Sequence, residues 1–128
     1  MEIIKTKVNF HDPRGDIRDI IADTPVSHIT LITCEPGSVR GNHYHKATTH
    51  YDYILKGSFD LYTRTGEDGP ITKTTVTAGD VVYSPPNEAR AYKALEYGEL
   101  LFCLSGPSRS DPEEFKKDTV QLKEPMVT

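Results

Sequence analysis

Short runs rich in β-branched and aromatic residues, separated by turn signals, recur along most of this chain of 128 residues. No long apolar pattern with the period of a helix appears before the C-terminal segment. Nine glycines and nine prolines supply residues for tight turns. The runs predict about ten strands, over residues 3–8, 17–21, 28–34, 39–45, 50–56, 58–64, 71–77, 81–84, 89–95 and 99–105. So many short strands in so small a chain favour a β-sandwich or a closed barrel.

Three segments refine this expectation. Residues 28–34 are apolar on both faces, as in a strand that is buried on both sides. Residues 12–16 contain Pro and Gly and predict a turn before the second strand. Residues 111–117 predict a short helix with Ser110 or Asp111 as its N-cap, because acids come first and lysines last. We therefore expect one all-β domain over residues 1–128 with a short C-terminal helix.

Composition excludes several classes of protein. The net charge of −4 argues against a general nucleic-acid binder. No apolar run approaches the roughly 20 residues that span a bilayer, and the N-terminus shows no secretory pattern. Cys34 and Cys103 lie in apolar runs and are expected to be buried, reduced thiols. These features predict a cytoplasmic protein with neither a nucleic-acid partner nor a membrane contact.

Three of the five histidines form a cluster in the sequence. His43 and His45 are separated by one residue of a predicted strand, so their side chains point to the same face. His50 begins the next predicted strand, which is expected to pair alongside. Three neutral imidazoles in one cavity suit a divalent first-row metal and leave coordination positions open. The alternative is a polar strand face that is exposed to solvent.

The spacing around these histidines resembles the first motif of the cupin superfamily. That motif reads Gly, five residues, His-x-His, three or four residues, Glu, six residues, Gly. Here Gly37, His43, His45 and Gly57 match it, and His50 stands where the Glu usually is. The resemblance implies a double-stranded β-helix, or jelly-roll barrel, with the motif histidines facing the cavity.

The second cupin motif is matched in part. It reads Gly, five residues, Pro-x-Gly, two residues, His. Gly79 and Pro85 match, Asn87 replaces a Gly, and Arg90 replaces the His. Asn tolerates a left-handed turn, but a guanidinium cannot ligate a metal. The resemblance covers about residues 30–105.

A narrower resemblance concerns the nucleotide-sugar cupins, which include dTDP-4-dehydrorhamnose 3,5-epimerases and dTDP-sugar 3,4-ketoisomerases. Those families carry Asp-x-Arg-Gly near the N-terminus and Arg-Gly-x-His on an inner strand. The matching residues here include Arg14 in the first element and Arg40 and His43 in the second. The resemblance implies that His43 and His45 are a metal-free proton-transfer pair, and that Arg40 and Arg14 contact the sugar or phosphate of the ligand.

Three further residues are candidates for catalysis in such a cavity. Arg90 and Tyr92 share one strand face, and either could stabilise an oxyanion. Asp52 shares a face with His50 and could orient a histidine. Two of them have a plainer interpretation: Arg90 as a surface salt bridge, and Asp52 as a solvated residue at the barrel mouth.

The sequence thus predicts a small-molecule enzyme, an isomerase or epimerase that acts on a keto sugar or a related carbonyl substrate without a cofactor. One alternative is a metal-dependent cupin, a dioxygenase or metal-assisted isomerase, with one divalent transition metal on His43, His45 and His50. Another is a non-catalytic cupin that binds a small molecule. A homodimer is expected, because small barrels of this family commonly pair by sheet contacts.

Overall fold

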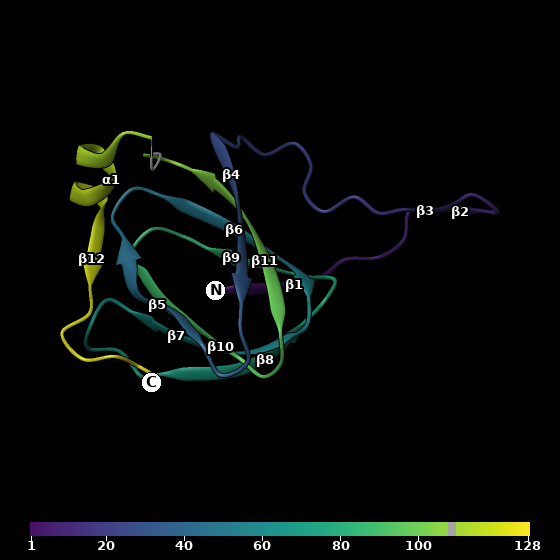
Figure 1. The fold of residues 1–128 in the computed structure, drawn as a ribbon. Helices are drawn as coiled ribbons and strands as arrows, with labels where there is room; N and C mark the ends of the chain where they lie inside the picture. Colours follow the sequence, from purple (N-terminus) through teal and green to yellow (C-terminus); the bar gives the residue numbers. More distant parts are fainter. Residues whose placement is uncertain (108–109) are drawn as a thin grey trace.

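The computed structural model describes residues 1–107 and 110–128. The described chain consists of short strands and one short helix (Figure 1). The elements are β1 (Glu2–Lys5), β2 (Phe10–Asp12), β3 (Gly15–Ile17), β4 (His28–Cys34), β5 (Val39–His45), β6 (Thr49–Lys56), β7 (Ser58–Thr65), β8 (Thr72–Thr77), β9 (Asp80–Ser84), β10 (Glu88–Ala94), β11 (Gly98–Ser105), α1 (Pro112–Asp118) and β12 (Thr119–Gln121).

Two antiparallel sheets face each other in a jelly roll (Figure 1). One has the order β1-β9-β6-β11-β4 and the other the order β12-β5-β10-β7-β8. No pairing joins β4 to β5 among the described residues, so the two sheets do not close into a continuous barrel. The prediction of an all-β jelly roll with a short C-terminal helix is confirmed.

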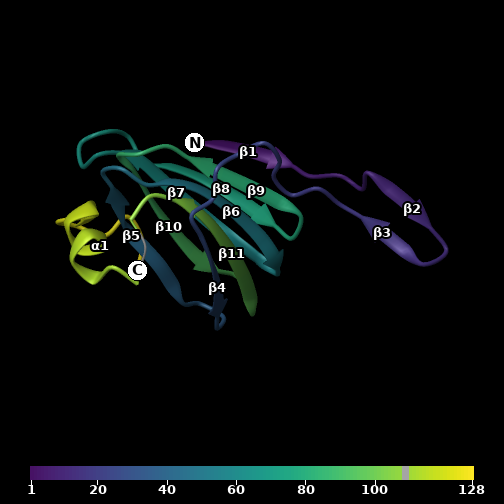
Figure 2. The ribbon, with the colours of Figure 1, turned by 90° about the horizontal axis from the view of Figure 1, so that it is seen from above.

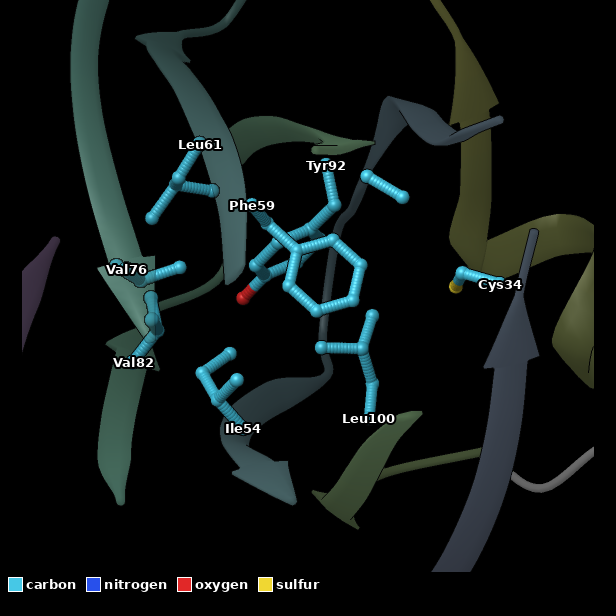
Figure 3. Close-up of a cluster of buried hydrophobic side chains, with 9 residues drawn as sticks. Cys34, Ile54, Phe59, Leu61, Val76, Val82, Tyr92 and Leu100 are labelled. Atoms are coloured by element: carbon cyan, nitrogen blue, oxygen red, sulfur yellow. The ribbon is translucent and has the colours of Figure 1, made fainter. Parts of the chain in front are cut away.

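A cluster of apolar side chains fills the space between the sheets at one end (Figure 3). Alternate residues of β7 enter this core, because successive side chains of a strand point to opposite faces. Gly98 lies directly beneath Phe59, and a Cβ at this position would lie 2.8 Å from Cε1 of the Phe59 ring. The core consists of Cys34, Ile54, Phe59, Leu61, Val76, Val82, Tyr92, Ala94 and Leu100.

The N-terminal region differs from the sequence prediction. The strand predicted over 17–21 is wrong, since only Ile17 of that run is in a strand. Instead β2 and β3 pair as a hairpin that projects from the body of the molecule (Figure 2). The Asp12 carboxylate accepts hydrogen bonds from the backbone N–H of Arg14 at 2.9 Å and from its guanidinium at 2.6 Å, which closes the turn. Phe10 and Ile17 are 51% and 58% exposed on this hairpin.

Strand β4 is half-buried on one face and exposed on the other, contrary to its apolar pattern. It lies at one edge of its sheet. The outward-facing Ile29 and Leu31 are 61% and 57% exposed, whereas Cys34 is buried. The prediction of a strand buried on both sides is therefore wrong for this strand.

The C-terminal segment packs against the histidine strand. Asp111 is the N-cap of α1, and its carboxylate accepts a hydrogen bond from the Glu114 N–H at 3.4 Å. After the helix, β12 pairs with β5. The amide of Asn42 on β5 then holds the tail, because it accepts from the Met126 N–H and donates to the Val127 carbonyl. No described helix is long and apolar enough to cross a membrane.

Candidate active site

A cavity of about 520 Å³ lies between the sheets, with walls from both of them and from α1. Residues of β4 and β5 form its sides, and side chains of β6, β10 and β11 form its floor. Its lining residues are Thr30, Leu31, Ile32, Thr33, Val39, Arg40, Gly41, His43, His45, His50, Arg90, Tyr92, Phe102, Leu104 and Phe115. The cavity therefore combines an apolar wall with a group of histidines and arginines.

The structure brings the three predicted histidines together at this cavity. His43 and His45 lie on the inner face of β5, and their ring centroids are 5.1 Å apart in an edge-to-face arrangement. The rings of His45 and His50 are stacked, with centroids 4.9 Å apart. Alternation along β5 brings His43 and His45 to one face, as the sequence predicts. The expectation that the strand of His50 pairs alongside is wrong, because β6 belongs to the other sheet and His50 reaches the cavity from the facing layer.

The hydrogen bonds around His45 determine where its ring carries a proton. Nδ1 of His45 lies 3.3 Å from the carboxylate Oδ2 of Asp118 and 3.2 Å from the hydroxyl of Thr119. The Thr119 hydroxyl donates its own hydrogen to the Phe115 carbonyl. Both neighbours of Nδ1 are thus acceptors, so Nδ1 carries the hydrogen and Nε2 keeps its lone pair.

Asp118 is itself held firmly at the end of α1. It is 5% exposed, and its carboxylate accepts hydrogen bonds from the Ala47 N–H at 2.6 Å and the Thr48 hydroxyl at 2.5 Å. Burial, together with the charge of Arg90, lowers the pKa of His45 from 6.5 to about 3. His45 is therefore a neutral imidazole at physiological pH, oriented by a buried carboxylate.

A second buried network occupies the cavity floor. The Arg90 guanidinium donates from Nε to Asp52 Oδ2 at 3.0 Å, and its Nη2 contacts both ring nitrogens of His50, Nε2 at 2.7 Å. Nδ1 of His50 lies 3.1 Å from Asp52 Oδ1, and the Tyr92 hydroxyl donates to Asp52 Oδ2 at 2.8 Å. Asp52 is 0% exposed, so all of its partners are protein groups of this network.

Electrostatics fix the charge states of this network. Burial opposes ionisation of Asp52, but the charge of Arg90 and the bond from His50 outweigh it, and the pKa of the carboxyl is lowered. Burial and the adjacent Arg90 lower the pKa of His50 from 6.5 to about 4. Burial also raises the pKa of Tyr92 well above its ordinary value. At neutral pH the network thus holds one anion and one cation, with His50 and Tyr92 neutral.

The two remaining predicted residues lie in different places. Arg40 lines the cavity, and its Nη2 donates to the Thr33 carbonyl across the space between β5 and β4 at 3.0 Å. Arg14 lies in the turn between β2 and β3, paired with Asp12, and is not among the residues that line the cavity of its own chain.

Most of the chain matches a known protein family. A family model described as "Cupin domain" matches residues 30–105, more than half of the chain. The chain belongs to the cupin family. Among curated proteins, no sequence matches this cupin.

Solved structures with the same fold include several sugar-modifying enzymes. The dTDP-4-dehydrorhamnose 3,5-epimerase from Sulfolobus tokodaii is 21% identical with a TM-score of 0.75, over 91% of this chain and 73% of its own. A 3,4-ketoisomerase from Helicobacter canadensis is 16% identical with a TM-score of 0.77, over 94% and 89%. A sugar 3,4-ketoisomerase from Thermoanaerobacterium thermosaccharolyticum, in complex with TDP, is 18% identical with a TM-score of 0.77, over 95% and 88%. Several matching epimerases are longer, and this cupin spans 63–66% of their length.

The histidines of this cupin do not fit a metal centre. Within residues 1–107 and 110–128, no group of three or more His, Cys, Asp or Glu side chains is placed to hold a metal ion. The chemical cause is Arg90, which lies against both nitrogens of His50 and brings a positive charge to the place where a dication would bind. The predicted ligand set of His43, His45 and His50 is thus close in space but unsuited to coordination.

Sequence reasoning missed Asp118, which orients His45 from another part of the chain. One signal was available. An acidic residue in the last turn of a helix is unfavourable to the helix dipole, and Asp118 follows two lysines that suit that position. A carboxylate placed against the dipole indicates a role outside the helix. Asp118 meets that expectation through its contacts with Thr48 and His45.

Proposed function

We propose that this cupin is an isomerase or epimerase that moves a proton next to the carbonyl group of a keto sugar or a related small molecule. The hydrogen bonding of His45 carries the proposal. Its Nδ1 faces two acceptors, so Nε2 is the nitrogen that can take a proton from carbon. The Asp118 carboxylate, 3.3 Å from Nδ1, would stabilise the imidazolium that forms.

The other cavity residues complete this chemistry. His43 supplies a second imidazole at 5.1 Å between ring centroids, so one histidine can remove the proton and the other can return it at a different position. Arg90 lines the same cavity, and its guanidinium can stabilise the negative charge that develops on the carbonyl oxygen. The roles of Asp52 and Tyr92 are indirect, because both are committed to the network that holds Arg90.

Nucleotide-linked sugars are the substrate class that we favour. The similar solved structures include dTDP-sugar epimerases and sugar ketoisomerases, among them a ketoisomerase in complex with TDP. A cavity of about 520 Å³ is of the size that small-molecule ligands occupy. In this proposal Arg40, at the cavity wall, contacts the sugar or phosphate.

Solvent exchange tests the proposal directly. The protein, dialysed against a chelator, is incubated with a dTDP-4-keto sugar in D₂O, and deuterium next to the carbonyl is measured by NMR. We expect exchange with the natural sequence, its loss in His45→Gln and His43→Gln, and its retention in Lys73→Gln on the distant strand β8. Binding of the sugar without exchange would instead identify a non-catalytic binding protein, and exchange that needs added metal would contradict metal-free proton transfer.

We also propose that the chain forms a homodimer. Ile29 and Leu31 expose apolar surface on the outer face of β4, and Phe10 and Ile17 do so on the projecting hairpin. A second copy would cover these residues, and Arg14 could then contact the ligand in the cavity of the partner subunit. Light scattering should give twice the mass of one chain, and Ile29→Asp, at a position that does not line the cavity, should give a monomer. A monomeric natural protein would refute the dimer.

A further inference from the structure

The two residues that differ from the cupin motifs, His50 and Arg90, contact each other. His50 stands at the motif Glu position and Arg90 at the motif His position. In the structure Nη2 of Arg90 lies 2.7 Å from Nε2 of His50, and the pair is anchored by Asp52. Both side chains are nearly inaccessible to solvent. The two replacements therefore form a single unit at the cavity floor.

A count of hydrogens assigns the role of His50 within this unit. A guanidinium only donates hydrogen bonds, and an ionised carboxylate only accepts them. Arg90 Nη2 contacts both ring nitrogens of His50, and Asp52 Oδ1 faces Nδ1, so Nδ1 is the ring nitrogen with an acceptor beside it. The arrangement that satisfies both neighbours places the hydrogen on Nδ1 and the lone pair on Nε2. Both nitrogens of His50 are thus engaged, and His50 has no nitrogen left for a substrate proton or a metal.

The hydrogen bonds of Arg90 leave one nitrogen of its guanidinium for a ligand. Its Nε is bonded to Asp52 and its Nη2 to His50. Arg90 lines the cavity, so Nη1 is the nitrogen left to face a ligand there. The Phe102 ring lies 5.6 Å from the guanidinium carbon and restricts its movement. A buried arginine with two of its three nitrogens fixed presents the third in one orientation.

We propose that Arg90 is the built-in cation of this cavity, that it takes the place of a metal ion, and that His50 is a positioning residue which directs Nη1 toward an oxygen anion of the ligand. This inference deepens the proposed function, because the oxygen in question would be the enolate oxygen of the keto substrate. The positioning of Arg90 by His50 involves protein groups only. It can therefore be tested without that substrate.

The first test is the protonation pattern of His50 in the natural protein. Long-range ¹H–¹⁵N NMR at pH 7 distinguishes the two neutral tautomers and the imidazolium, and the His50→Gln spectrum identifies the signal. We expect hydrogen on Nδ1 and an unprotonated Nε2. Hydrogen on Nε2, or a charged ring, would overturn the inference, and no variant has to keep its activity for this result.

The second test compares two substitutions of His50. In His50→Gln the side-chain carbonyl can still accept from Arg90, whereas His50→Leu keeps a similar volume without any acceptor. We expect separate, slowly rotating Nη signals of Arg90 in the natural protein and in His50→Gln, and their collapse in His50→Leu. Unchanged Arg90 signals in His50→Leu would overturn the positioning role.

The third test uses the dTDP-4-keto sugar. We expect His50→Leu to lower kcat by about tenfold or more, with a smaller change in KM, and His50→Gln to restore most of the rate. Equal rates in both variants would overturn the catalytic part of the inference. If the natural protein turns over no such sugar, the proposed function fails while the tautomer measurement still decides the role of His50.

Discussion

Mild acid should destabilise this fold, because two neutral histidines are buried in it. Folding lowers the pKa of His45 to about 3 and that of His50 to about 4, from 6.5 for each. Below pH 6.5 the unfolded chain binds a proton at each site and the folded chain does not. Protons therefore favour the unfolded state, and stability falls with pH until the folded pKa values are reached near pH 4 and 3.

The size of the effect follows from the width of that window. Each pH unit between the two pKa values changes the free energy of unfolding by about 1.4 kcal/mol per group. From pH 7 to pH 5 the two histidines together would remove about 4 kcal/mol. The Asp118 carboxylate, 3.3 Å from His45, would stabilise a charged ring and reduce this loss. We therefore expect a loss of about 2 to 4 kcal/mol, a large part of the stability of a small domain.

Urea unfolding at pH 5, 6 and 7, followed by circular dichroism, measures this loss. The double variant His45→Gln/His50→Gln should lose most of the pH dependence, although it will be less stable at pH 7. His11→Gln, on the exposed hairpin, serves as the control and should keep the full dependence. If the double variant loses as much stability between pH 7 and 5 as the natural protein, the reasoning from buried neutral histidines is refuted. The depressed pKa of Asp52 adds a further loss only at lower pH, since its ordinary value is 3.8.

Three other predictions concern packing, orientation and metal content. Gly98→Ala should cost about 1 to 3 kcal/mol in urea unfolding, because the new methyl group meets the Phe59 ring within a closed core; an unchanged midpoint would contradict this packing. Asp118→Asn should lower turnover of the keto sugar by about 10- to 100-fold, with a smaller change in stability, because His45 loses a charged partner; equal turnover would remove Asp118 from the mechanism. Elemental analysis of untagged protein should find less than one transition metal per chain, and a stoichiometric metal that disappears in His50→Ala would contradict the role given to Arg90.

The sequence predicts the parts of the site that lie close together in the chain. The convergence of His43 and His45 follows from alternation along one strand, and His50 joins them because the following strand belongs to the facing layer. The contact between Arg90 and His50 spans 40 positions, and no local pattern indicates it. The sequence indicates His50 and Arg90 as separate candidates, but it does not predict that they contact each other.

The errors in the predicted fold have a common physical cause. Apolar alternation reports what a strand could bury, and it does not report whether a second layer covers it. Ile29 and Leu31 are apolar in a strand that the topology places at a sheet edge, so their outward faces remain exposed. Residues 17–21 have the composition of a strand, but only Ile17 finds a partner strand, in the short hairpin.

The contact between Asp118 and His45 has a consequence for the order in which the protein becomes competent. All three histidines of the cavity precede β7 in the chain, whereas the Asp118 carboxylate that sets the tautomer of His45 follows β11. A nascent chain that has already formed both sheets apart from β12 would thus still hold an imidazole free to change tautomer. Docking of α1 is in this sense a maturation step, and it delays chemistry at the cavity until the remainder of the fold is in place.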